Sequence, residues 1–208
     1  MPKLKRALSI NDLYEKNYDI LPFTGAWLDH IGQPERKGSW CLYGHSGNGK
    51  TSYATQMARY LATFGKVWYN GLEEGSALSF KKALQRVGME AVKKNFNLIE
   101  DPFEDLTVRL KRRNRPDFCF IDSSQLFLRS FDDYLRLEHD FAGKTQFIYI
   151  SHAEGKKPEG RIAKRVEYLS FVKVWIEGYK AFPKSRYGGT EPFIIYPKRA
   201  AEYWSDIK

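Results

Sequence analysis

The sequence predicts a single α/β domain built on a mainly parallel sheet with an antiparallel edge. Short apolar runs typical of strands alternate with amphipathic segments of about 10 to 15 residues, the order expected of βαβ units. One such run, "WCLY", is followed directly by the glycine-rich segment "GHSGNGKTS". The last two apolar runs, 171–178 and 191–197, follow each other without a helical pattern between them. They favour an antiparallel extension at one edge of the sheet.

Each strand is expected where a continuous apolar run is bounded by glycine or charge, the pattern of a strand buried on both faces. The expected strands are 38–44, 66–70, 96–100, 117–123, 145–151, 171–178 and 191–197, with Tyr203 and Trp204 joining an edge.

Each helix is expected where apolar residues recur at helical spacing. In the helix that begins within "GKTS" and ends at Gly65, for example, Ala54, Met57, Ala58 and Leu61 stand at i, i+3, i+4 and i+7. The other expected helices are 24–32, 75–88, 103–113 and 130–143. Residues 1–23 are expected to form an irregular arm ahead of the domain, which spans 24–208.

Length and composition indicate a soluble globular protein with one core. The chain has 208 residues, of which 42% are apolar and 28% charged, and a net charge of +9. No apolar run approaches the length of about 18 residues that a transmembrane helix requires. The basic N-terminus is not followed by the apolar region of a signal peptide. Cys41 and Cys119 lie in apolar runs and are interpreted as buried thiols of a reducing cytoplasm.

The segment from Gly44 to Ser52 matches the phosphate-binding loop G-x-x-x-x-G-K-[ST] between an expected strand and an expected helix. Backbone N–H groups at the start of a helix, together with its macrodipole, suit the phosphates of ATP. Lys50 would reach the β- and γ-phosphates, and the Thr51 hydroxyl would bind Mg²⁺. The predicted nucleotide-binding residues are Gly44, His45, Ser46, Gly47, Asn48, Gly49, Lys50, Thr51 and Ser52. His45 and Asn48 occupy variable positions of the motif, and no side-chain chemistry is assigned to them.

Carboxylates follow two of the expected strands at the edge where open α/β sheets bind ligands. Asp122 ends the run "FCFI" and is predicted to help hold Mg²⁺. Glu73 and Glu74 follow strand 66–70, where a carboxylate can orient the water that attacks the γ-phosphate. Two adjacent acids leave the choice open, and Glu73 is favoured. Acids at a helix start are also common because they suit the helix dipole.

Ser151 and His152 end another strand at the same edge, where a polar group could sense the γ-phosphate. The following stretch, 154–160, is rich in glycine, proline and lysine and is expected to be mobile. Five basic residues crowd the segment 153–165: Lys156, Lys157, Arg161, Lys164 and Arg165. The basic run 109–115, in contrast, is interpreted as a solvated face at the end of a helix.

In chain order, the phosphate-binding loop, "EE", "IDSSQ", "ISHAEG" and "KSRYGG" resemble the RecA-like ATPase core, most closely its RadA and DnaB-helicase branch. The resemblance covers about residues 24–204. No counterpart is found of the RadA zinc finger and protease-like domain, or of the N-terminal collar of replicative helicases. What remains resembles the minimal RecA-like ATPases of phages and mobile elements.

The resemblance implies an ATPase that acts on single-stranded DNA as an oligomer, either a ring or a filament. It implies that Lys50, Thr51 and Asp122 bind Mg-ATP, that Glu73 activates water, and that His152 links the γ-phosphate to a DNA-facing loop over 153–165. Lys184 and Arg186 of "KSRYGG" would act on the nucleotide of a neighbouring subunit.

Three functions stay open at this point. The first is a DNA-stimulated ATPase in recombination, annealing or strand remodelling. The second is a RecA-fold ATPase that switches a protein partner without contacting DNA. The third is a small-molecule P-loop kinase, which the lack of an arginine-rich lid disfavours. No membrane association is expected.

Overall fold

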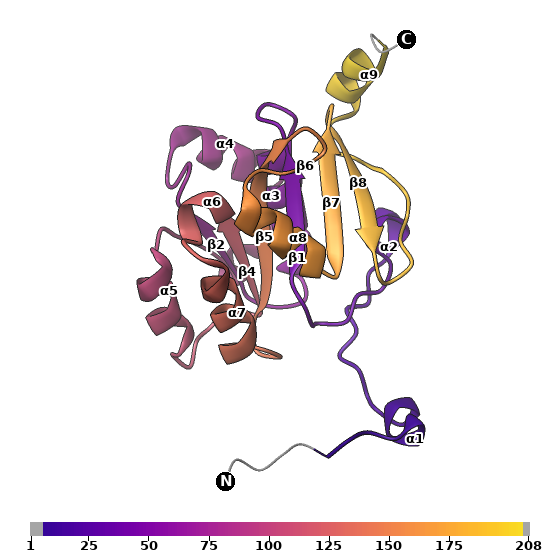
Figure 1. Ribbon diagram of the computed structural model, residues 1–208. Coiled ribbons are helices and arrows are strands. Elements are labelled where there is room, and N and C mark those ends of the chain that lie inside the picture. The colour runs from indigo at the N-terminus through magenta and orange to yellow at the C-terminus, as the bar shows by residue number, and fades with distance from the viewer. Residues whose placement is uncertain (1–5, 206–208) are drawn as a thin grey trace.

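A mixed β-sheet with helices packed on both faces organises the computed structural model, which describes residues 6–205 (Figure 1). The strands follow the order β3-β2-β4-β5-β1-β7-β8-β9, and the short β6 pairs with β5 off this path. Their bounds are β1 Trp40–Gly44, β2 Val67–Gly71, β3 Phe96–Ile99, β4 Phe118–Asp122, β5 Gln146–Glu154, β6 Lys157–Pro158, β7 Val172–Glu177, β8 Lys180–Ser185 and β9 Phe193–Ile194. Strands β1 to β5 and β7 pair in parallel, whereas β8 and β9 extend the edge in antiparallel pairing. The predicted fold class is therefore confirmed.

The helices cover both faces of this sheet (Figure 1). Their bounds are α1 Ile10–Tyr14, α2 Gly25–Ile31, α3 Lys50–Leu61, α4 Leu78–Arg86, α5 Phe103–Leu110, α6 Ser124–Phe127, α7 Phe131–Asp140, α8 Arg161–Leu169 and α9 Pro197–Ser205, with a 3₁₀ segment, η1, over Met89–Asn95.

Two apolar cores, one on each face of the sheet, explain why the central strands are apolar throughout. Along β4, Phe120 belongs to one core with Leu61 of α3, whereas Ile121 belongs to the other with Leu137 of α7. Successive strand side chains point to opposite faces, so both faces of β4 need apolar residues. Cys119 lies in the second core as a free thiol, in agreement with the prediction that it is a small buried hydrophobe.

Parallel pairing brings the C-terminal ends of four strands to one edge of the sheet. Gly44, at the end of β1, is the register partner of His152 in β5. Asp122, at the end of β4, is the partner of Gly71 in β2. The loops that follow these strands therefore meet at this edge.

The segment 153–165, expected to be a loop, contains regular secondary structure. Strand β5 continues to Glu154 and turns back into β6, and α8 begins at Arg161. Ala163 and Val166 are buried on the inner side of this helix. The sequence did contain this signal, because Ile162, Val166 and Leu169 stand at helical spacing.

The C-terminal region also differs from the prediction. Strand β8 was missed because Pro183 is disfavoured in a strand; it lies beyond the short part of β8 that pairs with β9. Tyr203 and Trp204 lie in helix α9, not in an edge strand. This helix begins at Pro197, and proline is favoured in the first turn of a helix.

The N-terminal arm extends away from the sheet (Figure 1). Its short helix α1 has no buried residue, but Leu21 and Phe23 are buried in the first core. The domain boundary at residue 24 stays a prediction. Residues 1–5 of the arm and 206–208 of the domain lie outside the described residues. Between residues 6 and 205, no helix combines the length and apolar character needed to cross a membrane.

Glu138 on α7 is a carboxyl group placed against the second core. It accepts a hydrogen bond of 3.3 Å from the Tyr149 hydroxyl. Burial raises the pKa of Glu138 to about 7, against the effect of this hydrogen bond. Below about pH 7 the protonated form is therefore favoured in the folded protein.

We expect the unfolding free energy of the wild-type protein to fall between about pH 4.5 and pH 7 through ionisation of Glu138, and Glu138→Gln to remove this part of the pH dependence. The wild-type carboxyl group ionises near pH 4.5 when unfolded but near pH 7 when folded, so its unfolding free energy should fall as pH rises through this window. The loss should reach at most about 3 kcal/mol relative to the glutamine variant and stay constant above pH 7. Urea denaturation of both proteins from pH 4 to 8 measures it. A stability difference that does not change with pH would contradict the assignment.

Candidate functional site

The phosphate-binding loop connects β1 to α3 at the carboxyl edge of the sheet, and two of its glycines are structurally required. Gly49 has φ +100°, in the left-handed region that strains other residues. A Cβ atom on Gly44 would lie 2.3 Å from the Ile176 carbonyl oxygen of the adjacent β7. The nine predicted nucleotide-binding residues run from Gly44, the last residue of β1, through this loop to Ser52 in the first turn of α3.

Asn48 fastens this loop to the turn between β7 and β8. Its Oδ1 accepts a hydrogen bond of 2.8 Å from the Gly178 N–H, and its carbonyl oxygen accepts one of 3.2 Å from the Tyr179 N–H. His45 instead lies with its ring edge-on to Trp175, 5.7 Å between centroids. The side chain of Asn48 therefore has a structural contact that the motif did not predict.

Lys50 lies at the start of α3 in the same cavity as Thr51. Its Nζ donates a hydrogen bond of 3.1 Å to the carbonyl oxygen of His45, within the loop. Burial lowers the pKa of Lys50, and the negative charges of Glu73 and Asp122 act in the opposite direction. A phosphate group would replace the weak carbonyl partner with a strong anionic one.

Asp122, at the end of β4, is buried and hydrogen-bonded. Its Oδ2 accepts a hydrogen bond of 2.6 Å from the hydroxyl of Tyr69, a residue of β2 that the sequence interpretation missed. Burial raises the pKa of Asp122 to about 6; the Tyr69 hydrogen bond opposes this effect, and the charges of Glu73 and Glu74 add to it. A cation beside Asp122 would stabilise its ionised form.

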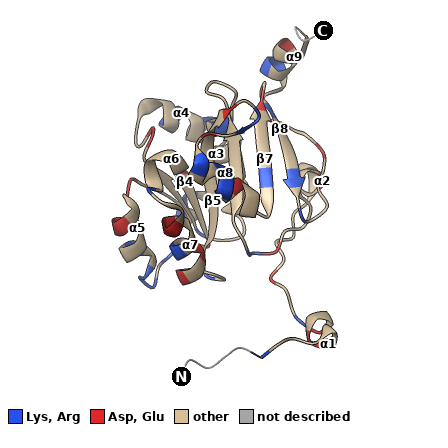
Figure 2. Cartoon of the chain, viewed as in Figure 1, with Lys and Arg blue, Asp and Glu red and all other residues tan. Residues whose placement is uncertain are grey.

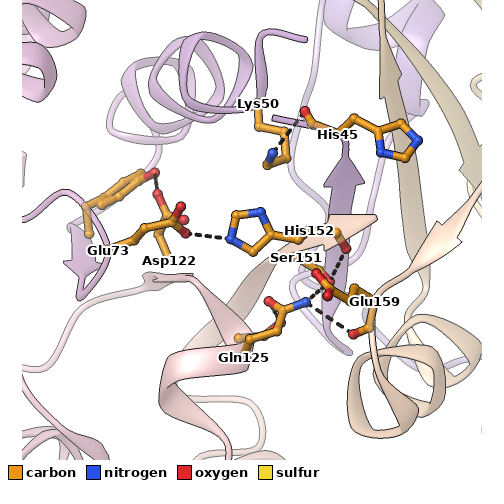
Figure 3. Close-up of polar contacts among 10 residues, drawn as sticks. His45, Lys50, Glu73, Asp122, Gln125, Ser151, His152 and Glu159 are labelled. Carbon is orange, nitrogen blue, oxygen red and sulfur yellow. Dashed lines mark hydrogen bonds and ion pairs between the residues drawn. The ribbon is translucent and has the colours of Figure 1, made fainter. Parts of the chain in front are cut away.

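Glu73 and His152 are joined by a hydrogen bond across the site. His152 Nε2 lies 3.0 Å from Glu73 Oε2, and Figure 3 shows the imidazole pointing toward Glu73 and Asp122. The turn that carries Glu73 is held by hydrogen bonds from the N–H groups of Leu72 and Glu73 to the Asp122 carbonyl oxygen. Glu74 lines the same cavity. The preference for Glu73 as the catalytic carboxylate stays a prediction, supported by this contact.

Gln125 connects the end of β4 to the end of β5 (Figure 3). Its Nε2 donates to Ser151 Oγ at 2.7 Å and to the Glu159 carbonyl oxygen at 3.2 Å. Ser151 Oγ in turn donates to the His152 carbonyl oxygen at 2.7 Å. This network fixes the backbone on both sides of the His152 imidazole.

One cavity of about 420 Å³ collects the predicted metal-binding groups and three of the five predicted catalytic residues. The predicted residues that line it are Ser46, Gly47, Gly49, Lys50, Thr51, Ser52, Glu73, Glu74, Asp122 and His152. The same cavity is lined by Arg86, Tyr179 and Arg199, which the sequence interpretation missed. Arg199 belongs to the unexpected helix α9 and donates a hydrogen bond of 2.9 Å to the Tyr179 hydroxyl.

The residues present fit a magnesium ion. Thr51 and Asp122 offer hydroxyl and carboxylate oxygens in the same cavity as Lys50, and Mg²⁺ usually needs only one or two protein ligands beside water and phosphate oxygens. Within residues 6–205, no group of three or more His, Cys, Asp or Glu side chains forms a metal cage. The donors therefore suit a metal that arrives with the nucleotide.

Lys184 and Arg186 are not brought to this cavity within the chain. Ser185 pairs with Val172, and Val172 pairs with Trp40, the first residue of β1. Both basic residues thus lie at the end of the sheet where the parallel strands begin, and the phosphate-binding loop lies at the opposite end. The guanidinium of Arg186 lies 4.2 Å from the ring centroid of Phe171.

The five basic residues of segment 153–165 lie on two elements beyond His152. Lys156 and Lys157 belong to the β5–β6 hairpin, whereas Arg161, Lys164 and Arg165 lie on α8. All five are exposed. Together they form a basic surface on the hairpin and on α8, next to the end of β5 that carries His152.

Comparison with solved structures identifies the fold. One solved ATPase domain matches with a TM-score of 0.56 and 13% identity, over 79% of this chain and 84% of that chain. The KaiC-like protein PH0186 from the hyperthermophilic archaeon Pyrococcus horikoshii OT3 matches with a TM-score of 0.62 and 15% identity, over 80% and 89%. The chain has a RecA-like P-loop fold.

The RecA-like fold also matches NeqB, an ATP synthase subunit from Nanoarcheaum equitans, with a TM-score of 0.55 and 12% identity, over 91% of this chain and 59% of that chain. The resemblance inferred from the motifs is confirmed for the RecA-like core. No protein-family model and no curated protein matches the chain by sequence.

We expect Lys50→Ala to abolish the stabilisation of the protein by Mg-ATP. The nucleotide-free variant should unfold within about 1 kcal/mol of wild type, because a partly buried ammonium group contributes little without an anion. Wild type at 100 times its Kd should gain about 2.7 kcal/mol, and the variant almost none. Thermal unfolding with and without Mg-ATP measures this, with the exposed Lys81→Ala of α4 as control. An undiminished gain in Lys50→Ala would place the phosphate site elsewhere.

Proposed function

We propose that this chain is a Mg²⁺-dependent ATPase that works as a homo-oligomer and couples ATP hydrolysis to single-stranded DNA. The observation that carries the proposal is the convergence, in one cavity, of Lys50, Thr51 and Asp122 with the hydrogen-bonded pair Glu73 and His152. The RecA-like fold supports it, because loops at the carboxyl ends of α/β strands are the usual ligand sites. The buried free thiols Cys41 and Cys119 support a reducing compartment such as the cytoplasm.

We assign each residue a role that fits its place in the cavity. The N–H groups at the start of α3 and the Lys50 ammonium hold the β- and γ-phosphates. Thr51 and Asp122 would hold Mg²⁺, which supplies positive charge to the phosphate oxygens when bound. The Glu73 carboxylate accepts a hydrogen bond from the attacking water and takes its proton. His152 orients that carboxylate through the 3.0 Å contact.

The His152 backbone provides a connection from this chemistry to the basic surface. Its carbonyl oxygen accepts hydrogen bonds from Ser151 Oγ and from the Glu159 N–H, at 2.7 and 2.8 Å. Glu159 lies just after the β5–β6 hairpin that carries Lys156 and Lys157. A γ-phosphate that shifts the Glu73–His152 pair as a unit would move His152 and so change the support of this hairpin and its grip on DNA phosphates.

The position of Lys184 and Arg186 supports catalysis between subunits. Because they lie away from the cavity of their own chain, they could stabilise transition-state charge only at a neighbour's nucleotide. A ring or a filament of identical subunits would place the same contact at every interface. The biological roles that fit are recombination, annealing or strand remodelling.

ATP turnover measured with and without single-stranded DNA tests the proposed function. Stimulation by DNA is expected. Turnover that ignores DNA would favour a switch acting on a protein partner, and phosphate transfer to a small acceptor would favour a kinase.

We expect Glu73→Gln to lower ATP turnover by about 10²-fold or more, because the glutamine amide cannot accept the proton of the attacking water. Binding of Mg-ATP should persist, since the phosphates are held by the loop. Glu74→Gln is the matched control and should retain most activity. The reverse pattern in steady-state turnover would assign the catalytic role to Glu74.

We expect a mixture of Arg186→Ala and Glu73→Gln proteins to recover ATPase activity that neither has alone. In a mixed oligomer some interfaces combine an intact Glu73 cavity with an intact Arg186 from the neighbour. Turnover is followed across mixing ratios, and formation of mixed oligomers is verified by crosslinking of differently tagged subunits. Mixed oligomers without recovery would exclude catalysis in trans by Arg186.

A further inference from the structure

We infer that helix α8 presents a stacking site for the bases of single-stranded nucleic acid, with Tyr168 as the stacking platform. This inference rests on the proposed function, in which the β5–β6 hairpin contacts DNA phosphates. It adds a neighbouring surface on which the bases stack. Four outward residues stand at i, i+3, i+4 and i+7 of α8, which places them on one helix face: Arg161, Lys164, Arg165 and Tyr168. Figure 2 shows the cations of α8 at the front of the molecule.

Tyr168 is the aromatic side chain of this face and has 76% of its surface exposed. An exposed aromatic ring among cations leaves apolar surface in water that a base can cover. Lys173 of β7 lies with its Nζ 5.7 Å from the centroid of this ring and donates a hydrogen bond to the Tyr168 carbonyl oxygen. The Tyr168 ring on α8 therefore has a cationic group of β7 beside it.

Arg165 adds a second flat surface beside Tyr168. Its guanidinium lies 3.5 Å from the centroid of Phe131, so one face of the guanidinium plane is supported by α7. A hollow of about 620 Å³ runs along this face, with Phe131 and Leu169 among its lining residues. Arginine planes and aromatic rings are the surfaces on which single-stranded bases stack.

The charge of this face favours a polyanion over a neutral protein surface, and the exposed Tyr168 ring favours a nucleic acid over an acidic peptide. Lys164 is paired with Glu154 at 3.1 Å, but within residues 6–205 neither Arg161 nor Arg165 forms an ion pair with a carboxylate. The face continues from the hairpin that carries Lys156 and Lys157. A strand whose phosphates contact the hairpin can therefore extend its bases along α8.

Binding of two oligonucleotides separates stacking from phosphate contact. One is a fluorescein-labelled oligothymidylate, and the other has the same backbone with abasic sites. With Mg²⁺ and a non-hydrolysable ATP analogue, wild type should prefer the thymidylate by about 5- to 150-fold for one stacked base. Tyr168→Ala should lose this preference, and Tyr168→Phe, which keeps the ring, should retain it. Tyr14→Ala, at an exposed tyrosine of α1, is the control.

Salt dependence supplies the second readout. Tyr168→Ala should weaken binding without changing the slope of log affinity against log salt, because a stacked ring releases no counterion. Changing Lys156, Lys157 and Arg161 together to Ala should reduce that slope by roughly two, at about 0.7 for each phosphate contact. A stacking site and a phosphate site thus give different signatures.

Three results would overturn the inference. A thymidylate preference that survives in Tyr168→Ala would remove the stacking role while leaving DNA binding intact. Dissociation of the oligomer by Tyr168→Ala in sedimentation velocity, with unchanged base preference, would make this face a protein interface. Wild type that binds neither oligonucleotide would exclude the DNA part of the proposed function as well, whereas Glu73-dependent ATP turnover would still support its catalytic part.

Discussion

The in-register parallel pairing of β1, β2, β4 and β5 is the constraint on which the candidate site depends. It places Gly44 opposite His152 and Asp122 opposite Gly71, so that four separate loops leave the sheet at one edge. Within the cavity, Glu73, Asp122 and His152 lie far in sequence from one another and from the phosphate-binding loop. A shift of one residue in any of these pairs would turn a buried strand's side chains to the opposite face. The two apolar cores therefore also fix the geometry of the cavity.

Burial gives this cavity its electrostatic character. Asp122 is held against Tyr69 in a place where its ionised form is costly, and Lys50 is likewise kept partly out of water. In the free protein Lys50 has a backbone carbonyl as its hydrogen-bond partner. A magnesium ion and a phosphate chain would supply the opposite charges to both groups at once. The site is thus arranged for a ligand that carries both signs of charge, which Mg-ATP does.

Strand β5 connects the proposed chemistry to the proposed contact with nucleic acid. Its end carries His152, and its continuation forms the hairpin and leads into α8. Gln125 and Ser151 fasten this end to the segment after β4. Since hydrogen bonds to its carbonyl oxygen tie His152 to the hairpin, a movement of His152 would be passed to the hairpin and not absorbed by a flexible loop.

The sequence by itself determined the parallel sheet, the phosphate-binding loop and the carboxylates at the ligand edge. These features depend on local patterns: apolar runs buried on two faces, glycines at fixed spacing, and polar residues directly after a strand. It did not reveal β8 or α9, because Pro183 interrupts the strand pattern and the helix packs through few apolar residues.

Only the tertiary structure decided which side chains meet. Tyr69 contacts Asp122, His152 contacts Glu73, and Arg199 reaches Tyr179 through pairings between elements far apart in the chain. It also decided that Tyr168 lies exposed on the outer face of helix α8. Sequence spacing states which residues can share a strand end or a helix face. Which of these faces is covered, and by what, depends on packing between distant elements.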